Sequence, residues 1–158
     1  MIDSVEWRPD RAAEIIAGHA GTEGAALPIL HDLQAEFGHV PAEAVPLLAE
    51  ALNLSRADVH GVVSFYHDFR DHPPGRHLLH LCRAEACQSV GGDALAEHAR
   101  ARLGAGWGQT STDGALTLEP IFCLGLCACA PAAMLDGQVI GRLDQARLDA
   151  IIDEARAR

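Results

Sequence analysis

Two pairs of cysteines are the residues in this chain whose type and spacing could do chemistry. Cys82 and Cys87 form a C-x4-C pair, and after an interval of 35 residues Cys123 and Cys127 form a C-x3-C pair. Four thiolates brought together from two loops can hold a metal ion or an iron–sulfur cluster. A fifth cysteine, Cys129, lies two residues past the second pair, and we expect it to be a small thiol outside the ligand set.

The elements around the cysteines must bring the two pairs to one place. Apolar runs predict a strand over residues 76–82 and another over residues 116–123, so that each pair lies in a loop after a strand. Strands that run in the same direction end at the same edge of a sheet, where the four sulfur atoms can converge. Glycine and alanine dominate the flanks of both pairs, and such small residues let backbone N–H groups approach a cluster closely.

The rest of the C-terminal half predicts an α/β domain. We expect a helix over residues 89–103, strands over 131–135 and 139–143 around the Asp136-Gly137 turn, and a closing helix over 144–157. The resulting order is strand, helix, strand, strand, strand, helix, which is typical of a small thioredoxin-like sandwich. This half therefore has a core of its own beneath the cysteine loops.

The first half of the chain is expected to be helical. Apolar periodicity predicts four helices, over residues 10–19, 26–37, 42–52 and 56–64. Ser55 and Asp58 form the capping signature of the last one. The stretch Asp71-His72-Pro73-Pro74-Gly75 breaks the helical pattern. We therefore predict two domains, a helical N-terminal domain over residues 1–73 and the cysteine-containing domain over residues 74–158.

The composition limits the classes of function. The 158 residues carry 22 acidic and 12 basic side chains, a formal charge of −10, so binding of nucleic acid through a general basic patch is not expected. No apolar run approaches the roughly 20 residues that span a bilayer. No signal peptide is visible either, so we expect a cytoplasmic protein without direct membrane insertion. Disulfides are uncommon in that compartment, which favours metal or redox chemistry for the clustered cysteines.

Three other interpretations of the cysteines compete with an iron–sulfur cluster. A structural zinc site takes four cysteines at similar spacings, but it usually staples a small domain that lacks a core. A thioredoxin-type dithiol needs a C-x2-C motif at a helix start, which the sequence lacks. Ordinary buried cysteines are not expected as two close pairs after two strands. The chemistry alone ranks a [2Fe–2S] cluster first and zinc second, and none of the nine histidines is counted as a ligand.

The cysteine spacing and the helical half resemble a known family. The C-x4-C…C-x3-C pattern with its 35-residue interval is similar to the thioredoxin-like [2Fe–2S] ferredoxin subunit of complex I, its 24 kDa (E) subunit. The helical half agrees with this likeness in the segments Leu27-Pro28-Ile29-Leu30, Gly38-His39-Val40-Pro41 and Ser64-Phe65-Tyr66. The resemblance implies an α/β protein with an N-terminal helical bundle followed by a thioredoxin-like [2Fe–2S] ferredoxin domain. It also implies four cluster ligands, namely Cys82, Cys87, Cys123 and Cys127.

Within that family, the segment from Cys82 to Gly92 looks most like the gamma subunit of soluble, molybdenum-dependent, NAD-linked formate dehydrogenases, and Tyr66-His67-Asp68-Phe69 points the same way. The resemblance implies an electron-transfer subunit. In such a complex a neighbouring flavoprotein subunit holds FMN and binds NAD(H), and a larger subunit contains molybdenum and iron–sulfur centres. An E-type subunit of NADH:quinone oxidoreductase or of an NAD-linked hydrogenase is the alternative within the family. A zinc-stapled assembly module without redox activity is the alternative outside it.

Overall fold

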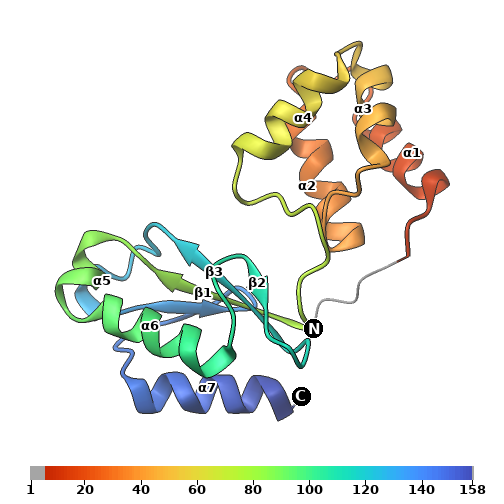
Figure 1. The fold of residues 1–158 in the computed structure, drawn as a ribbon. Helices are drawn as coiled ribbons and strands as arrows, with labels where there is room; N and C mark the ends of the chain where they lie inside the picture. Colours follow the sequence, from red (N-terminus) through yellow and green to blue (C-terminus); the bar gives the residue numbers. More distant parts are fainter. Residues whose placement is uncertain (1–5, 158) are drawn as a thin grey trace. The chain divides into compact units, whose positions relative to one another are not determined.

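The chain divides into two compact units between Pro73 and Pro74. The computed structural model describes residues 6–157. Helices fill the first unit, called the helical unit below, and the second, called the sheet unit, contains the strands (Figure 1). The boundary of the two predicted domains lies at the same place in the sequence. Independent folding of the two halves stays a prediction.

Four helices build the helical unit: α1 (Pro9–Gly18), α2 (Ala26–Phe37), α3 (Ala44–Leu52) and α4 (Arg56–Phe65). Their apolar faces pack into a core in which Ile29, Phe37 and Leu48 are fully buried. Gly38 and Asn53 have left-handed backbone conformations, with φ values of 77° and 52°, and they end α2 and α3. The helix predicted over residues 26–37 is therefore found with the same bounds.

The starts of α3 and α4 follow from proline and capping chemistry. The sequence predicts α3 from residue 42, but the helix begins at Ala44, which places Pro46 in the first turn, where the missing N–H has no helical partner to lose. At α4 the Ser55 hydroxyl accepts the Asp58 N–H at 3.1 Å, and the Asp58 carboxylate accepts the Ser55 N–H at 3.1 Å. Hydrogen bonds from the hydroxyl and the N–H of Ser55 hold the pKa of Asp58 below its ordinary value.

Five strands form a sheet with the order β2-β3-β1-β4-β5. Their bounds are β1 (His77–Cys82), β2 (Gln109–Thr110), β3 (Leu116–Ile121), β4 (Ala133–Leu135) and β5 (Gln138–Ile140). β1 and β3 run parallel, with Cys82 opposite Ile121, and the other pairs are antiparallel. The two strands that precede the cysteine pairs therefore end at the same edge of the sheet, as the sequence predicts.

Helices α5 (Glu85–Ser89), α6 (Gly92–Leu103) and α7 (Gln145–Ala157) complete the sheet unit. Leu79 and Leu81 of β1 belong to one buried cluster with Ala99 of α6 and Ile152 of α7. Alternate strand residues point to the same side of a sheet, so both long helices cover one face (Figure 1). This core holds β1 and β3, whose ends carry the cysteines.

None of the helices within residues 6–157 is long and apolar enough to cross a bilayer.

The structure differs from the predicted elements beside the cysteines. The prediction misses β2, because two residues are too few to form a recognisable pattern. The helix predicted over residues 89–103 is interrupted, since Gly91 has a φ of 95° and α6 starts only at Gly92. Cys82 ends β1, as the strand predicted over residues 76–82 implies, but Cys87 lies in the short helix α5 rather than in a loop. The second strand ends at Ile121, two residues earlier than the predicted range 116–123.

Candidate metal centre

The ends of β1 and β3 bring the four predicted ligands into one region of the sheet unit. Cys82 ends β1, and Cys87 lies in the short helix that follows. Cys123 comes two residues after β3, and Cys127 opens a 3₁₀ turn, η1 (Cys127–Cys129). Because β1 and β3 are parallel neighbours, both pairs lie at the same edge of the sheet.

The thiols interact both within the pairs and between them. The thiols of Cys82 and Cys87 share a hydrogen bond, and so do those of Cys123 and Cys127. The Cys82 sulfur also accepts hydrogen bonds from the N–H groups of Cys123 and Leu124 in the other segment. Electrostatic contact extends from Cys127 to both Cys82 and Cys87. The four thiols therefore belong to one site.

Burial and crowding change the acidity of these thiols in opposite directions. Burial alone would raise the pKa of Cys82, but hydrogen bonds from the Ala84 N–H and the Cys87 thiol bring that pKa below its ordinary value. Burial raises the pKa of Cys87, and the neighbouring Cys82 raises it further. The hydrogen bond with Cys123 and the charge of Cys123 raise the pKa of Cys127. Four thiolates this close need positive charge between them, which bound metal ions supply.

The grouping of the thiols suits a cluster with two irons. Within residues 6–157, no group of three or more His, Cys, Asp or Glu side chains is placed to hold a single metal ion. A [2Fe–2S] cluster does not require such a group, because its four protein ligands are divided between two irons. The hydrogen-bonded couples Cys82–Cys87 and Cys123–Cys127 match that division. The residues present therefore fit a two-iron cluster.

One couple is buried and the other lies at the surface. Cys82 and Cys87 pack with Ala132 in a small apolar cluster, and all three are buried. Cys123 and Cys127 are exposed. Thus one side of the site faces the apolar interior of the sheet unit, and the other side faces solvent.

The backbone of the second segment is bent sharply around Cys123. Cys123 has a φ of 101°, which is unusual for a residue with a side chain, and Gly125 has a φ of 74°. Strain of this kind costs on the order of 1–3 kcal/mol and is concentrated at functional sites. Here the bend lets the Gly125 N–H donate a hydrogen bond to the Cys123 sulfur at 3.3 Å. Such N–H groups stabilise thiolate ligands.

The family model of thioredoxin-like [2Fe–2S] ferredoxins matches residues 12–156, nearly the whole chain. This chain belongs to the thioredoxin-like [2Fe–2S] ferredoxins. The match confirms the thioredoxin-like fold and the [2Fe–2S] cofactor that the sequence predicts. The four cysteines of this ferredoxin are the proposed ligands of that cofactor.

Relatives of the ferredoxin are subunits of NAD(H)-linked enzymes. A Rhizobium meliloti E-type subunit of NADH-quinone oxidoreductase is 37% identical over 141 residues, which cover 89% of this chain and 84% of the relative. The alpha subunit of the NAD-reducing hydrogenase HoxS of Cupriavidus necator is 31% identical over 146 residues, which cover 92% of this chain and 24% of the relative. A crystal structure of NAD⁺-reducing [NiFe]-hydrogenase in the air-oxidized state matches with a TM-score of 0.71 at 32% identity, over 84% of this chain and 23% of that chain.

These relatives bear on the branch of the family. E-type subunits of NADH-quinone oxidoreductase and subunits of NAD-reducing and NADP-reducing hydrogenases are similar to this ferredoxin. They favour the E-type or hydrogenase alternative over the formate dehydrogenase interpretation. The ferredoxin corresponds to about a quarter of the two hydrogenase chains named above.

Cys129, the last residue of η1, contacts the segment that follows β5. A Cβ atom added at Gly141 would lie 2.8 Å from the Cys129 Cβ, so the two residues are in close contact. The Cys129 carbonyl also accepts the Arg142 N–H at 2.5 Å. These contacts hold Cys129 against the segment that follows β5, and we keep it outside the proposed ligand set.

Two buried histidines of β1 have carboxylate partners. His77 Nδ1 lies 2.6 Å from an oxygen of Asp136, and His80 Nε2 lies 3.2 Å from an oxygen of Glu119. The first pair links β1 to the turn between β4 and β5, and the second links β1 to β3. Both histidines thus hold the sheet together, and neither is among the proposed ligands.

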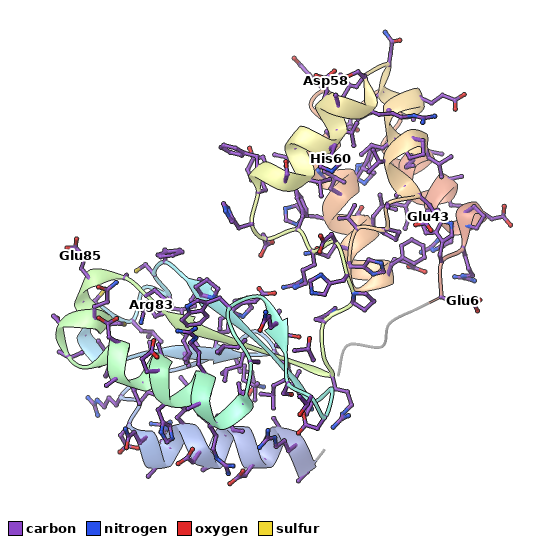
Figure 2. The ribbon with its side chains drawn as sticks, in the orientation of Figure 1. Glu6, Glu43, Asp58, His60, Arg83 and Glu85 are labelled. Atoms are coloured by element: carbon purple, nitrogen blue, oxygen red, sulfur yellow. The ribbon has the colours of Figure 1, made fainter. Side chains whose placement is uncertain are left out.

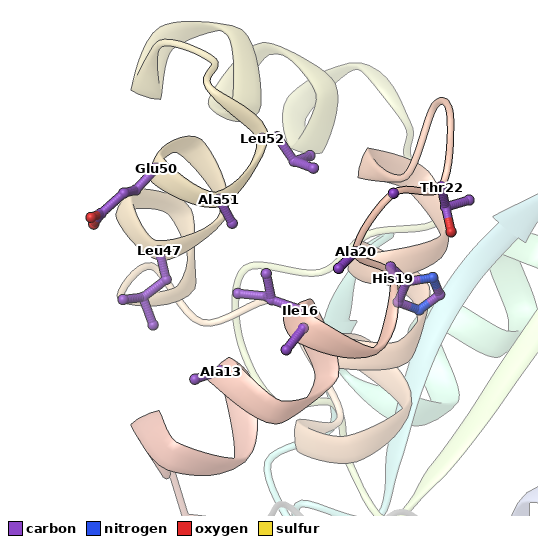
Figure 3. Close-up of a pocket in the computed structure, with 11 residues that line it drawn as sticks. Ala13, Ile16, His19, Ala20, Thr22, Leu47, Glu50, Ala51 and Leu52 are labelled. Atoms are coloured by element: carbon purple, nitrogen blue, oxygen red, sulfur yellow. The ribbon is translucent and has the colours of Figure 1, made fainter.

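A cavity of about 410 Å³ lies between α1 and α3 in the helical unit (Figure 3). Ile16, Leu47 and Leu52 make part of its wall, and His19 and Glu50 are polar residues at its border. The first 73 residues contain no cysteine, so no thiol lines this cavity and it is not part of the four-thiol site.

Gly92 and Arg83 contact the cysteine segments but were not among the predicted site residues. A Cβ atom added at Gly92 would lie 2.6 Å from the Cys87 carbonyl oxygen, so α6 starts directly against Cys87. The Gly91-Gly92 pair between two helical stretches is the signal that could have indicated this close approach. Arg83, labelled in Figure 2, contacts Asp93 and Trp107, which lie 10 and 24 residues away, and contacts at such separations leave no local pattern.

Proposed function

We propose that this ferredoxin is the E-type electron-transfer subunit of an NAD(H)-linked oxidoreductase complex, with one [2Fe–2S] cluster on Cys82, Cys87, Cys123 and Cys127. The observation that carries the proposal is that four thiols lie close together at the ends of two parallel strands, in a chain that belongs to this family. A cluster of this kind supplies one-electron chemistry when bound.

The residues of the chain give that cluster an inner and an outer side. Ala132 and Leu124 pack around the buried couple Cys82–Cys87 and keep water away from it. The Ala84 N–H donates to the Cys82 sulfur, and hydrogen bonds of this type are one control on reduction potential. The exposed couple lies on the outer side, next to Phe122, a residue that is 75% exposed. A partner that docks on this side would come close to the cluster.

The partner in this proposal is a flavoprotein subunit that holds FMN and binds NAD(H). NAD(H) delivers a hydride, a two-electron unit, and a flavin can pass those electrons on one at a time. The sequence of the ferredoxin has no dinucleotide fingerprint and no P-loop, so NAD(H) is assigned to the partner. Phe122 and Val90 are exposed apolar residues beside the cysteines, and the formal charge of −10 favours a partner with a basic face. The helical unit is expected to add to the contact.

An anaerobic titration tests the electron-transfer role. NADH should scarcely reduce the isolated ferredoxin, because the chain has no flavin to split the hydride. Added FMN subunit should permit reduction when the cluster potential is within reach of NADH, and dithionite should reduce the cluster without the partner. Phe122→Ser should weaken capture of the flavin subunit about tenfold or more, as at other central aromatic contacts, with unchanged cluster absorbance.

The result that contradicts the proposal is equally definite. A chain that neither binds the flavoprotein nor gives a dithionite-reducible [2Fe–2S] signal is not an electron-transfer subunit. A [2Fe–2S] protein is red-brown, whereas a zinc protein is colourless. A colourless protein with stoichiometric zinc would therefore replace this proposal with the structural assembly module.

The parent complex is the finer part of the proposal. The E-type subunits and hydrogenase subunits among the relatives support an NADH:quinone oxidoreductase or an NAD-linked hydrogenase. The likeness of the segment from Cys82 to Gly92 supports a formate dehydrogenase, with a larger molybdenum- and iron–sulfur-containing subunit, as the second candidate. Purification of the tagged chain with its native companions separates these candidates, because the companions would contain quinone-reducing, nickel–iron or molybdenum centres. A cytoplasmic location belongs to the same proposal.

A fragment that starts at Pro74 should fold and take up the cluster without the helical unit. The sheet unit has a buried core of its own between β1, β3, α6 and α7, and few contacts are expected across a Pro-Pro-Gly boundary. Circular dichroism and visible absorbance of the reconstituted fragment measure this. An insoluble, colourless fragment beside a coloured full-length chain would mean that the two halves depend on one common core.

A further inference from the structure

The guanidinium of Arg83, the residue that directly follows Cys82, is held between Trp107 and Asp93. Arg83 directly follows Cys82, and its Cζ atom lies 5.6 Å from the centre of the Trp107 ring, a cation–π distance. Its Nη1 atom is buried and lies 2.8 Å from Oδ1 of Asp93, in an ion pair without hydrogen-bond geometry. The contact with Asp93 is therefore one of charge.

The backbone of Arg83 is tied to both cysteine segments. Its N–H donates to the Ile121 carbonyl at 2.7 Å, and its carbonyl accepts from the Gln88 side chain at 2.6 Å. Ile121 lies two residues before Cys123, and Gln88 directly follows Cys87. The base of the Arg83 side chain is thus fixed with respect to both couples of the proposed ligand set.

The partner of Arg83 lies on the same side of the site. Asp93 is the second residue of α6, and the first, Gly92, is so close to Cys87 that an added Cβ atom would lie 2.6 Å from the Cys87 carbonyl oxygen. The ion pair therefore stands between the start of α6 and the segment that contains Cys82 and Cys87.

The two charges of this pair are screened unequally. The side chain of Arg83 is 23% exposed, whereas that of Asp93 is 63% exposed. Water and salt screen the more exposed Asp93 carboxylate more strongly than the Arg83 guanidinium. The net electrostatic effect of the pair on the cysteines is therefore that of a positive charge.

We infer that the positive charge of Arg83 raises the reduction potential of the cluster, and that Asp93 limits this effect. The inference rests on the proposed function, because it takes Cys82 and Cys87 as ligands. Reduction brings in one electron, from dithionite in the test, and turns one ferric ion ferrous, with no ligand or proton released. The guanidinium stabilises the negative charge that is added, so it favours the reduced state over the oxidised state.

Potentiometric titration of the cluster-loaded full chain, followed by electron paramagnetic resonance, tests this inference. Arg83→Gln should lower the equilibrium constant for reduction by roughly threefold to tenfold, where tenfold corresponds to about 59 mV for a one-electron couple. Asp93→Asn should shift the potential in the opposite direction by a smaller amount. The double variant should return towards the wild-type potential, and Arg83→Lys, which keeps the charge but not the flat stacking group, should lie closer to wild type than Arg83→Gln.

Arg100 and Glu97 provide a matched control on the same helix. They form an exposed ion pair at 3.0 Å, more than one turn further along α6, so Arg100→Gln and Glu97→Gln should leave the potential unchanged. Equal potentials in Arg83→Gln and wild type, or shifts of the same sign in Arg83→Gln and Asp93→Asn, would overturn the inference and leave the proposed function intact. If Arg83→Gln fails to hold the cluster, Asp93→Asn decides alone, and an unchanged or lower potential overturns the inference. Absence of a dithionite-reducible signal in the wild type would instead refute the proposed function.

Discussion

Each of the substitutions Cys82→Ser, Cys87→Ser, Cys123→Ser and Cys127→Ser is expected to remove or reshape the [2Fe–2S] cluster, whereas Cys129→Ser should keep about two irons per chain. The physical reason is that a two-iron cluster needs four thiolates, and serine offers a weaker, less readily ionised oxygen. Iron content and visible absorbance after reconstitution measure the difference.

The two couples should respond to serine in different degrees. At the buried positions Cys82 and Cys87, an ionised serine would sit in apolar surroundings, so the expected result is loss of the cluster. At the exposed positions Cys123 and Cys127, solvent can support an oxygen ligand, and a shifted spectrum with partial iron retention is expected. Retention of an unchanged spectrum in Cys127→Ser together with loss in Cys129→Ser would show that Cys129 is the fourth ligand.

The helices and strands that the sequence predicted well are those whose boundaries depend on local chemistry. α2 is found over the predicted residues, Ala26–Phe37, because the periodic apolar face and the left-handed Gly38 both act within one helix. The two cysteine segments meet at one edge of the sheet because β1 and β3, with α5 and α6 between them in the chain, pair in parallel, the condition that the prediction of convergence required. β2 escaped prediction because its existence depends on pairing Gln109 with Leu118 rather than on a pattern of its own.

For the candidate site as well, the sequence predicted the features that depend on nearby residues and not those that depend on distant ones. The cysteine spacing is local, so the sequence indicated both couples. The residues that surround the couples come from distant parts of the sequence. Ala132, in the segment before β4, packs on Cys82 and Cys87. Trp107, in the segment after α6, makes the cation–π contact with Arg83. Such contacts arise only when the sheet is assembled, and no spacing rule contains them.

Gly92→Ala is expected to destabilise the sheet unit and loosen its hold on the cluster. The added methyl group would lie 2.6 Å from the Cys87 carbonyl oxygen and 2.8 Å from its carbonyl carbon, both of them backbone atoms that no rotamer change can move aside. Either α6 or the segment around Cys87 must shift, and overpacking of this kind costs about 1–3 kcal/mol. Because Cys87 is a proposed ligand, the shift would also alter the position of one thiolate.

Urea titration followed at the visible absorbance of the cluster measures this effect in the sheet unit, and Gly61→Ala is the matched control. Gly61 lies inside α4, and a Cβ atom added there meets nothing within 4 Å. The control should therefore gain about 0.5–1 kcal/mol of helix stability in the helical unit. It should leave the urea midpoint of the cluster signal unchanged, whereas Gly92→Ala should lower that midpoint and speed the loss of iron to a chelator. An unchanged midpoint and chelation rate in Gly92→Ala would mean that α6 can move away from Cys87 at no cost, so that the tight start of this helix does not support the cluster.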